Sequence, residues 1–457
     1  MTTALTRELG EFVAALRYEN IPAAALPVIR TGFTDCVGVM IAGSVEPVAS
    51  LLIAALKPPP GEATLVFGNN TAAAPEAAWI NATAAHALDF DDVALRGHPS
   101  AVLVPAILAE AQAIGASGKE MMTAYAAGYE TWAELVRRDA DHHHGKGWHP
   151  TGIFGAIGAA AACASLRKLD ASKATHAIAL GASQSAGLMA NFGTMTKPFH
   201  AGRAAHAGII SARLAGAGFT ASPDALEHPQ GFLSAVSPAG RIDVAMPVEA
   251  GKNWKLTRDK LSVKKYPLCF CTHRALDGML DLIAANPVAA KDVSRVTVSI
   301  SRTHATILRN HLPKTGLEAK FSMEFAMASA LIARRASLAE LQDEFVLRPE
   351  VQALMPRVAI EIQEREDPAQ PGKAIYDLVR VETADGRRME SARITQVRGG
   401  PEQPLTRDEL WAKFEGCVQV GPGRVPAREL FDALMSLDQL PHVSRLPGLT
   451  PFPRSKP

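Results

Sequence analysis

Three short strings in this sequence place ionisable side chains next to proline or glycine. They are Asp89-Phe90-Asp91-Asp92 leading to Gly97-His98-Pro99-Ser100, then Gly147-Trp148-His149-Pro150-Thr151-Gly152, then Thr196-Lys197-Pro198-Phe199-His200-Ala201-Gly202. Each string borders an apolar helical stretch, and proline or glycine fixes the backbone there, so carboxylates, imidazoles and an ammonium can be held in set positions. Proteins use these groups to move protons. The strings therefore predict a site for acid–base chemistry.

His98 and His149 each precede a proline. A residue before proline is disfavoured in the α conformation, so each histidine is expected at the entrance of a helix and not within it. Imidazole is the usual acid or base at neutral pH. One such histidine alone is more often structural, but two, each at the head of a helix of small residues, favour a site.

Asp89, Asp91 and Asp92 crowd three carboxylates into four positions. If all three faced one pocket, repulsion would raise a pKa or require a cation. Asp91 and Asp92 could equally cap or turn the backbone that leaves the preceding helix. Asp89 directly follows that helix and is expected to point inward. Lys197 lies in an otherwise uncharged stretch, where a lysine is costly unless it binds an anion, and anion binding is favoured.

Motifs for metals and nucleotides are missing from this sequence. His142, His143 and His144 are adjacent and point in different directions, so they indicate a solvated loop and not a metal site. There is no strand-bound GxGxxG and no GxxxxGK[ST], and the nearest approach to GxSxG has Ser185 in place of the final glycine. We therefore expect no metal, no cofactor and no acyl-serine chemistry.

Composition excludes several classes of partner. The chain has 457 residues, 47 basic and 46 acidic side chains and a net charge of +1, so no overall field attracts nucleic acid or an anionic membrane. The N-terminus lacks the cationic start and apolar core of a signal peptide. The five cysteines are scattered and are interpreted as small buried hydrophobic residues in a reducing compartment. These features predict a cytoplasmic protein.

Periodicity predicts a mainly α fold with an α+β part. Apolar residues recur at helical spacing over the first half of the chain, most clearly in 76–88, 101–114, 118–136, 155–166, 173–188 and 203–217. β-Branched alternation and a tight turn at Asp385-Gly386 then predict strands at 293–300, 357–362, 378–383 and 388–397, with helices at 273–285 and 321–334. Helix signals resume at Thr406 and at 427–437. We expect a large all-α domain from residues 1–266 and 405–457, with a smaller α+β domain, 267–404, inserted between them.

Taken together, the strings resemble the MmgE/PrpD family, which includes 2-methylcitrate dehydratase, cis-aconitate decarboxylase and iminodisuccinate epimerase. The likeness runs from Asp35-Cys36-Val37-Gly38 to the closing helices. Its most specific parts are His86-Ala87-Leu88-Asp89-Phe90-Asp91-Asp92, Gly97-His98-Pro99-Ser100, His149-Pro150-Thr151-Gly152, Lys197-Pro198-Phe199-His200 and Lys264 with Tyr266-Pro267. The resemblance implies an inserted lid domain, a homodimer through the helical domain and a cofactor-free site in the interdomain cleft.

Residue by residue, the resemblance implies five site residues. They are Asp89, His98, His149, Lys197 and Lys264. His200 and Tyr266 belong to the same strings and are expected to contact the substrate. Two positions depart from the decarboxylase pattern, because Val93 stands where a threonine is expected and Phe325 where a tyrosine is often found. Each change removes a hydroxyl group.

The three family reactions place charge on a carbon beside a carboxylate, which nearby cations must stabilise. The resemblance thus implies a small di- or tricarboxylate substrate bound by Lys197 and Lys264, with His98 moving the proton at carbon. His149 would assist, and Asp89 would fix a histidine tautomer or a lysine position. Because the missing hydroxyls count most against decarboxylation, dehydration of a 2-methylcitrate-like acid ranks first, epimerisation of an iminodisuccinate-like acid second and cis-aconitate decarboxylation third. A non-catalytic member that kept the fold is a further alternative, which the intact ionisable set disfavours.

Overall fold

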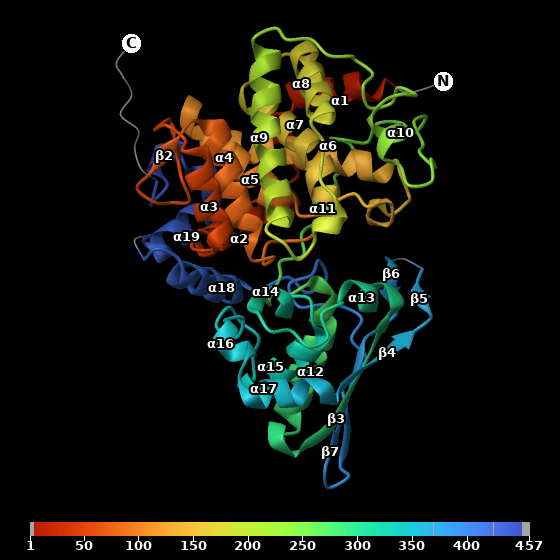
Figure 1. The fold of residues 1–457 in the computed structure, drawn as a ribbon. Coiled ribbons are helices and arrows are strands. Elements are labelled where there is room, and N and C mark those ends of the chain that lie inside the picture. Colours follow the sequence, from red (N-terminus) through yellow and green to blue (C-terminus); the bar gives the residue numbers. More distant parts are fainter. Residues whose placement is uncertain (1–3, 369, 424, 450–457) are drawn as a thin grey trace. The chain divides into compact units, whose positions relative to one another are not determined.

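The computed structural model describes residues 4–368, 370–423 and 425–449 (Figure 1). The chain divides into two compact units. The helical unit contains the described residues up to Val263 and from Thr406 onward, and the α+β unit contains Lys264–Leu405. The predicted class, mainly α with a smaller α+β part, is confirmed.

The helical unit is built around α7, which packs against α5, α6, α8 and α9. The bounds of its longer central helices are α4 Ala74–Ala87, α5 Pro99–Ile114, α6 Gly118–Arg137, α7 Pro150–Leu166, α8 Ala171–Ser183 and α9 Thr196–Gly216. Every residue of α7 except Ser165 is buried. Its small side chains allow close helix contacts: a Cβ on Gly128 of α6 would lie 2.7 Å from the Gly158 carbonyl oxygen.

Both chain ends contribute to the helical unit. Helix α1 packs on α8, while α2 packs on α4, α18 and α19. The bounds are α1 Leu5–Ala15, α2 Leu26–Gly43, α3 Pro47–Leu56, α10 Phe232–Val236, α11 Lys255–Arg258, α18 Arg407–Val420 and α19 Ala427–Met435, with a short pair β1 Ala63–Thr64 and β2 Thr71–Ala72. The segment Ala23–Gly43 is long and apolar enough to cross a membrane, but 67% of it is buried within the fold, as is typical of a core helix.

Some helix boundaries differ from those that the apolar periodicity predicts. Ser117 and Glu120 form a reciprocal capping box at the start of α6, and Thr406 caps α18 in the same way. Helix α7 begins at Pro150 and α9 at Thr196, several residues before their predicted starts. The first turns carry proline, lysine and histidine, which interrupt the apolar pattern although they are compatible with a helix start. Helix α8 ends at Ser183, earlier than predicted.

The α+β unit holds a four-stranded sheet in the order β4-β3-β7-β8. Strand β3 pairs in parallel with β4 and antiparallel with β7, and Val298 lies opposite both Ile360 and Val379. The bounds are β3 Val293–Ser301, β4 Val358–Gln363, β7 Leu378–Thr383 and β8 Arg388–Glu390, with a small hairpin of β5 Glu366–Asp367 and β6 Gln370–Ala374. The predicted hairpin of β7 and β8 is confirmed, although β8 is shorter than predicted.

Helices α12 and α15 pack on one another and on the sheet. The helices of this unit are α12 His273–Ala285, α13 Arg302–Ile307, α14 Gly316–Ala319, α15 Met323–Ala333, α16 Asp343–Val346 and α17 Pro349–Leu354. Phe325 is fully buried in the core of the unit, with its ring edge-on to Phe345 at 6.3 Å. The phenyl ring that replaces the expected tyrosine is therefore a core side chain.

Candidate functional site

Three helix entrances in the helical unit carry the predicted residues. His98 and His149 are the N-caps of α5 and α7, as predicted from the prolines that follow them. Proline is well placed at the first helical position because its missing N–H has no helical partner there. Lys197 lies in the first turn of α9. Because helix N-termini carry partial positive charge, this arrangement favours an anionic ligand.

Asp89 joins the lysine to one of these histidines. Its Oδ1 atom lies 2.6 Å from Lys197 Nζ and 3.8 Å from His98 Nε2. Asp89 follows α4 in the left-handed region, with φ +51°, which is strained for most residues and tolerated best by Asp and Asn. Such strain is concentrated at functional sites. The Lys197 charge thus has a carboxylate partner within the protein, as in one of the two roles that the resemblance implied for Asp89.

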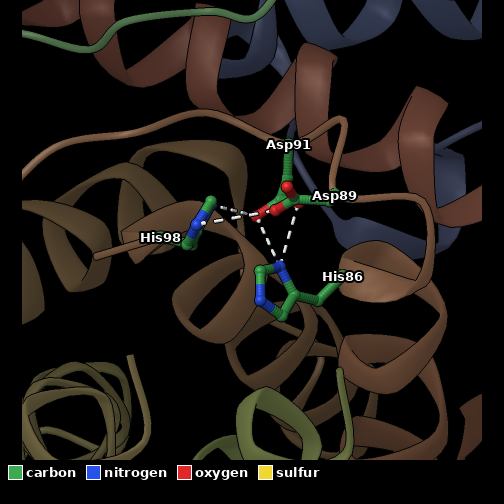
Figure 2. Close-up of side chains that lie close together, drawn as sticks. All are labelled: His86, Asp89, Asp91 and His98. Carbon is green, nitrogen blue, oxygen red and sulfur yellow. Dashed lines mark hydrogen bonds and ion pairs between the residues drawn. The ribbon is translucent and has the colours of Figure 1, made fainter. Parts of the chain in front are cut away.

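Asp91 links two histidines (Figure 2). Its carboxylate lies 3.0 Å from His86 Nδ1 and 2.9 Å from His98 Nδ1. His98 Nδ1 is also 2.9 Å from the Asp92 carbonyl oxygen. Since both neighbours accept hydrogen bonds, His98 Nδ1 carries the proton, and in the neutral ring Nε2 is left as the basic nitrogen. Asp91 and the Asp92 carbonyl therefore set the tautomer of His98. The sequence left open whether Asp91 turns the backbone or faces a pocket, and the structure buries its carboxylate between two histidine rings.

The pKa values of His86, Asp91 and Asp92 are strongly shifted. Burial alone would raise the pKa of Asp91, but the His86 and His98 rings hold it well below its usual range. Burial lowers the pKa of His86 to about 3, against the opposing effect of Asp91. Burial and the Asp35 carboxylate raise the pKa of Asp92 well above its usual range. At neutral pH the loop therefore carries an ionised Asp91 beside a neutral His86.

His149 continues the line of rings. Its ring is stacked on His86 at 5.8 Å between centroids, and its Nδ1 lies 3.1 Å from His200 Nδ1. Burial lowers the pKa of His149 well below its usual range. Burial and the Lys197 charge lower the pKa of His200 to about 4. Both rings are neutral at pH 7, so one ring can donate a hydrogen bond to the other.

Phe192 forms an apolar wall beside these groups. Lys197 Nζ lies 5.4 Å from its ring centroid, and the rings of His149 and His144 approach it edge-on at 4.9 and 6.1 Å. The prediction of a solvated loop at residues 142–144 is wrong for His143, which is fully buried 3.4 Å from Asp139. The His143 ring packs edge-on against Phe154 of α7, with 4.8 Å between the ring centroids, which accounts for its burial.

One group of side chains has metal-ligand chemistry. One ligand atom from each of His86, Asp89, Asp91 and His98 lies within 4.8 Å of the others (Figure 2). Divalent transition ions bind imidazole and carboxylate ligands. Here, however, Asp89 is paired with the Lys197 ammonium and Asp91 with two ring nitrogens. A metal ion would have to displace these partners, so the residues fit a proton-transfer site better than a metal centre.

The comparisons with known proteins cover both units. Residues 7–245 match the MmgE/PrpD N-terminal domain and residues 266–438 match the MmgE/PrpD C-terminal domain. The chain belongs to the MmgE/PrpD family.

Relatives of this MmgE/PrpD chain include three cis-aconitate decarboxylases. The Homo sapiens protein is 27% identical over 350 residues, which cover 74% of this chain and 71% of the relative. The Mus musculus protein is 24% identical over 389 residues, covering 82% and 78%. The Aspergillus terreus protein is 22% identical over 483 residues, covering 100% of this chain and 97% of the relative. The likeness therefore extends over both units.

Two predicted site residues of this MmgE/PrpD chain, Lys264 and Tyr266, belong to the α+β unit. Lys264 is buried. The Tyr266 hydroxyl donates to Asp277 Oδ1 at 2.7 Å, and burial and Asp277 raise the pKa of Tyr266. Their contact with a substrate stays a prediction.

The structure also brings into the site residues that the sequence reasoning had not counted among the five site residues. His86 and Asp91 complete the hydrogen-bonded cluster, and Phe192 lines it. His86 lies in the last turn of α4, whereas Asp91 follows the left-handed turn at Asp89, so no helical spacing links the two in the sequence. Val93 exchanges two backbone hydrogen bonds with Ser262, 2.8 and 3.0 Å long, so it anchors the end of the loop through its backbone.

Proposed function

We propose that this MmgE/PrpD protein is a lyase that acts on a small polycarboxylate by acid–base catalysis, without a metal or cofactor. The observation that carries the proposal is the position of Asp89 Oδ1, between the Lys197 ammonium and His98 Nε2. This arrangement supports the proposal, because a lysine ammonium binds carboxylates and the neighbouring imidazole nitrogen can accept a proton.

In the proposed reaction, His98 moves the proton at carbon. Asp91 and the Asp92 carbonyl hold the Nδ1 proton, so Nε2 accepts a proton from a carbon next to a carboxylate. The imidazolium that forms is stabilised by Asp89 and Asp91. Negative charge that develops on the substrate carboxylate is met by Lys197 and by the N-termini of α5, α7 and α9. His149 and His200, both neutral, orient the substrate by hydrogen bonds.

Dehydration of a 2-methylcitrate-like acid is the first candidate reaction. The electrons of the C–H bond form the double bond, the C–O bond breaks, and the proton held by His98 passes to the departing hydroxyl, so water leaves and the site regains its starting state. Val93 and Phe325 support this choice, because each lacks a hydroxyl expected in the decarboxylase pattern.

Decarboxylation of cis-aconitate is the second candidate, favoured by the names of the relatives. In that reaction a C–C bond breaks, its electrons stay on the carbon as carbon dioxide leaves, and His98, which has first taken a proton from solvent at Nε2, delivers that proton to the carbon. Both candidates need the same cation and the same imidazole.

The test is turnover by the purified full-length protein of 2-methylcitrate, cis-aconitate and iminodisuccinate, each measured separately. We expect turnover of 2-methylcitrate, and a loss of about 10²-fold or more in kcat for His98→Asn. The matched control is His228→Asn, which changes an exposed histidine of the same unit and should leave kcat unchanged. Turnover of cis-aconitate alone would favour the second candidate, and inactivity on every substrate would contradict the proposal and favour a non-catalytic family member.

A further inference from the structure

A lysine near the C-terminal end of the chain reaches the loop that carries Asp89 and Asp91. Lys413 lies on α18, and its side chain is only 5% exposed. Its Nζ atom is 2.6 Å from Asp35 Oδ1 and donates to the Phe90 carbonyl oxygen at 2.8 Å. The same ammonium lies 3.9 Å from the centroid of the Phe90 ring. Phe90 thus meets this ammonium through both its carbonyl oxygen and its ring.

Because the Lys413 ammonium is buried, it requires these contacts. A buried ammonium is costly unless it is paired and hydrogen-bonded, and Asp35, fully buried on α2, supplies the balancing charge. Without Lys413, the Asp35 carboxylate would face the buried Asp92, whose pKa it already raises. Lys413 therefore neutralises the buried Asp35 carboxylate beneath the loop. It also holds the loop backbone at Phe90, the residue between Asp89 and Asp91.

The geometry of that loop needs support. Asp89 adopts a left-handed conformation, which a free chain would rarely populate. A fixed Phe90 carbonyl keeps the peptide between Phe90 and Asp91 in place, so that Asp89 can meet Lys197 while Asp91 meets His86 and His98.

We propose that Lys413 is a positioning residue, which holds the Asp89–Asp92 loop of the site through the Phe90 carbonyl and the Asp35 carboxylate. The kinetic part of this inference rests on the proposed function, whereas the loop itself can be observed without any substrate.

The first readout is hydrogen–deuterium exchange of the full-length protein over residues 88–98. In Lys413→Met we expect amide exchange of this segment to accelerate by about tenfold or more, the scale of losing a hydrogen bond to a charged group. Lys413→Arg should exchange nearly as the unchanged protein does, because a guanidinium can serve both acceptors. The matched control is Arg407→Gln on the same helix, which removes an exposed ion pair with Asp432 and should leave the segment unchanged.

A double variant separates positioning from a merely structural ion pair. Lys413→Met with Asp35→Asn removes both buried charges, so it should recover much of the thermal stability lost in Lys413→Met alone. Because the bond to the Phe90 carbonyl is still missing, we expect fast exchange at 88–98 and a kcat reduced by about tenfold or more to persist.

These outcomes judge the proposal independently of the substrate. Exchange over 88–98 that is unchanged in folded Lys413→Met, or restored in the double variant, would overturn it. If the unchanged protein turned over none of the tested polycarboxylates, the proposed function would fail while the exchange measurements would still decide the role of Lys413. Where turnover is found, an altered pH dependence of kcat/KM in Lys413→Met, recovered in Lys413→Arg, would support it, and an unaltered one would contradict it.

Discussion

The Nδ1 atoms of His149 and His200 lie 3.1 Å apart, so one ring must donate a hydrogen bond and the other must accept it. Both rings are neutral at pH 7 because burial lowers the pKa of each. The tautomer of His149 is therefore tied to that of His200, and the Nε2 atom of His149 is protonated only when His200 is the donor.

The first prediction concerns this pair. His200→Phe removes the partner of His149 Nδ1, so the His149 ring can take either tautomer, and we expect kcat to fall by about tenfold or more. Nitrogen NMR of the His149 ring should show a single tautomer in the unchanged protein and a mixture in the variant. An unchanged His149 spectrum would show that His200 does not set the tautomer.

A second prediction concerns Asp91. Asp91→Asn leaves an amide where the carboxylate accepted from two ring nitrogens, so only the Asp92 carbonyl still holds the Nδ1 proton of His98, and the imidazolium loses a charge partner. We expect kcat to fall by about 10²-fold or more while the protein remains folded. Asp224→Asn, at a half-buried carboxylate that accepts from Ser222, is the control for a lost carboxylate and should retain full activity. Equal activities of the two variants would remove Asp91 from the mechanism.

Stability should depend on pH through the buried histidines. The pKa of His86 is lowered to about 3 and that of His200 to about 4, whereas an unfolded histidine titrates near 6.5. Between these values the unfolded chain binds more protons than the folded protein, so the stabilising contribution is complete above about pH 6.5 and is lost as the pH falls towards 4. Urea unfolding at pH 7.5, 6 and 5 should show this decline, and His200→Asn should make it shallower. A free energy of unfolding that is flat over this interval would contradict neutral buried rings.

The backbone at Gly187 passes close to both His149 and His200. It has φ +138°, and an added Cβ would lie 3.2 Å from His200 Cγ and 3.4 Å from His149 Cβ. Gly187→Ala should therefore lower both the melting temperature and kcat, with a stability cost of about 1–2 kcal/mol. Gly240→Ala is the matched control, because it also has a positive φ, +69°, but no atom within 4 Å of the new Cβ. It should lose some stability and keep its kcat, and a similar loss of kcat in both variants would contradict a specific role for the packing at Gly187.

Metal removal gives a further prediction. Because Lys197 and the ring nitrogens already pair the carboxylates of Asp89 and Asp91, dialysis against a chelator should leave turnover unchanged. Elemental analysis of the active protein should find less than about one metal ion per ten chains. Loss of activity on chelation, with recovery on adding one divalent metal, would refute a metal-free site.

Local rules predicted the helix entrances but not the contacts made there. His98-Pro99 and His149-Pro150 specify helix starts through backbone sterics alone, and the structure has both. The start of α9 was missed because Lys197 and His200 break the apolar period that identifies a helix.

The other contacts of the site were not predicted because they join residues that lie far apart in the chain. Lys197 meets Asp89 across 108 positions in the chain, and that contact depends on the left-handed turn at Asp89, which the residue type permits but does not require. The role of Asp91 likewise depends on how the loop reverses after α4. Side-chain pairing of this kind follows from packing of whole helices, which no short string encodes.

The most direct test of the account is a proton NMR time course of turnover in D₂O, with 2-methylcitrate and with cis-aconitate, for the unchanged protein and for His98→Asn. The account predicts that the unchanged protein exchanges or transfers hydrogen at a carbon beside a carboxylate, and that His98→Asn does so at least about 10²-fold more slowly. Equal rates of hydrogen transfer in the two proteins would contradict it.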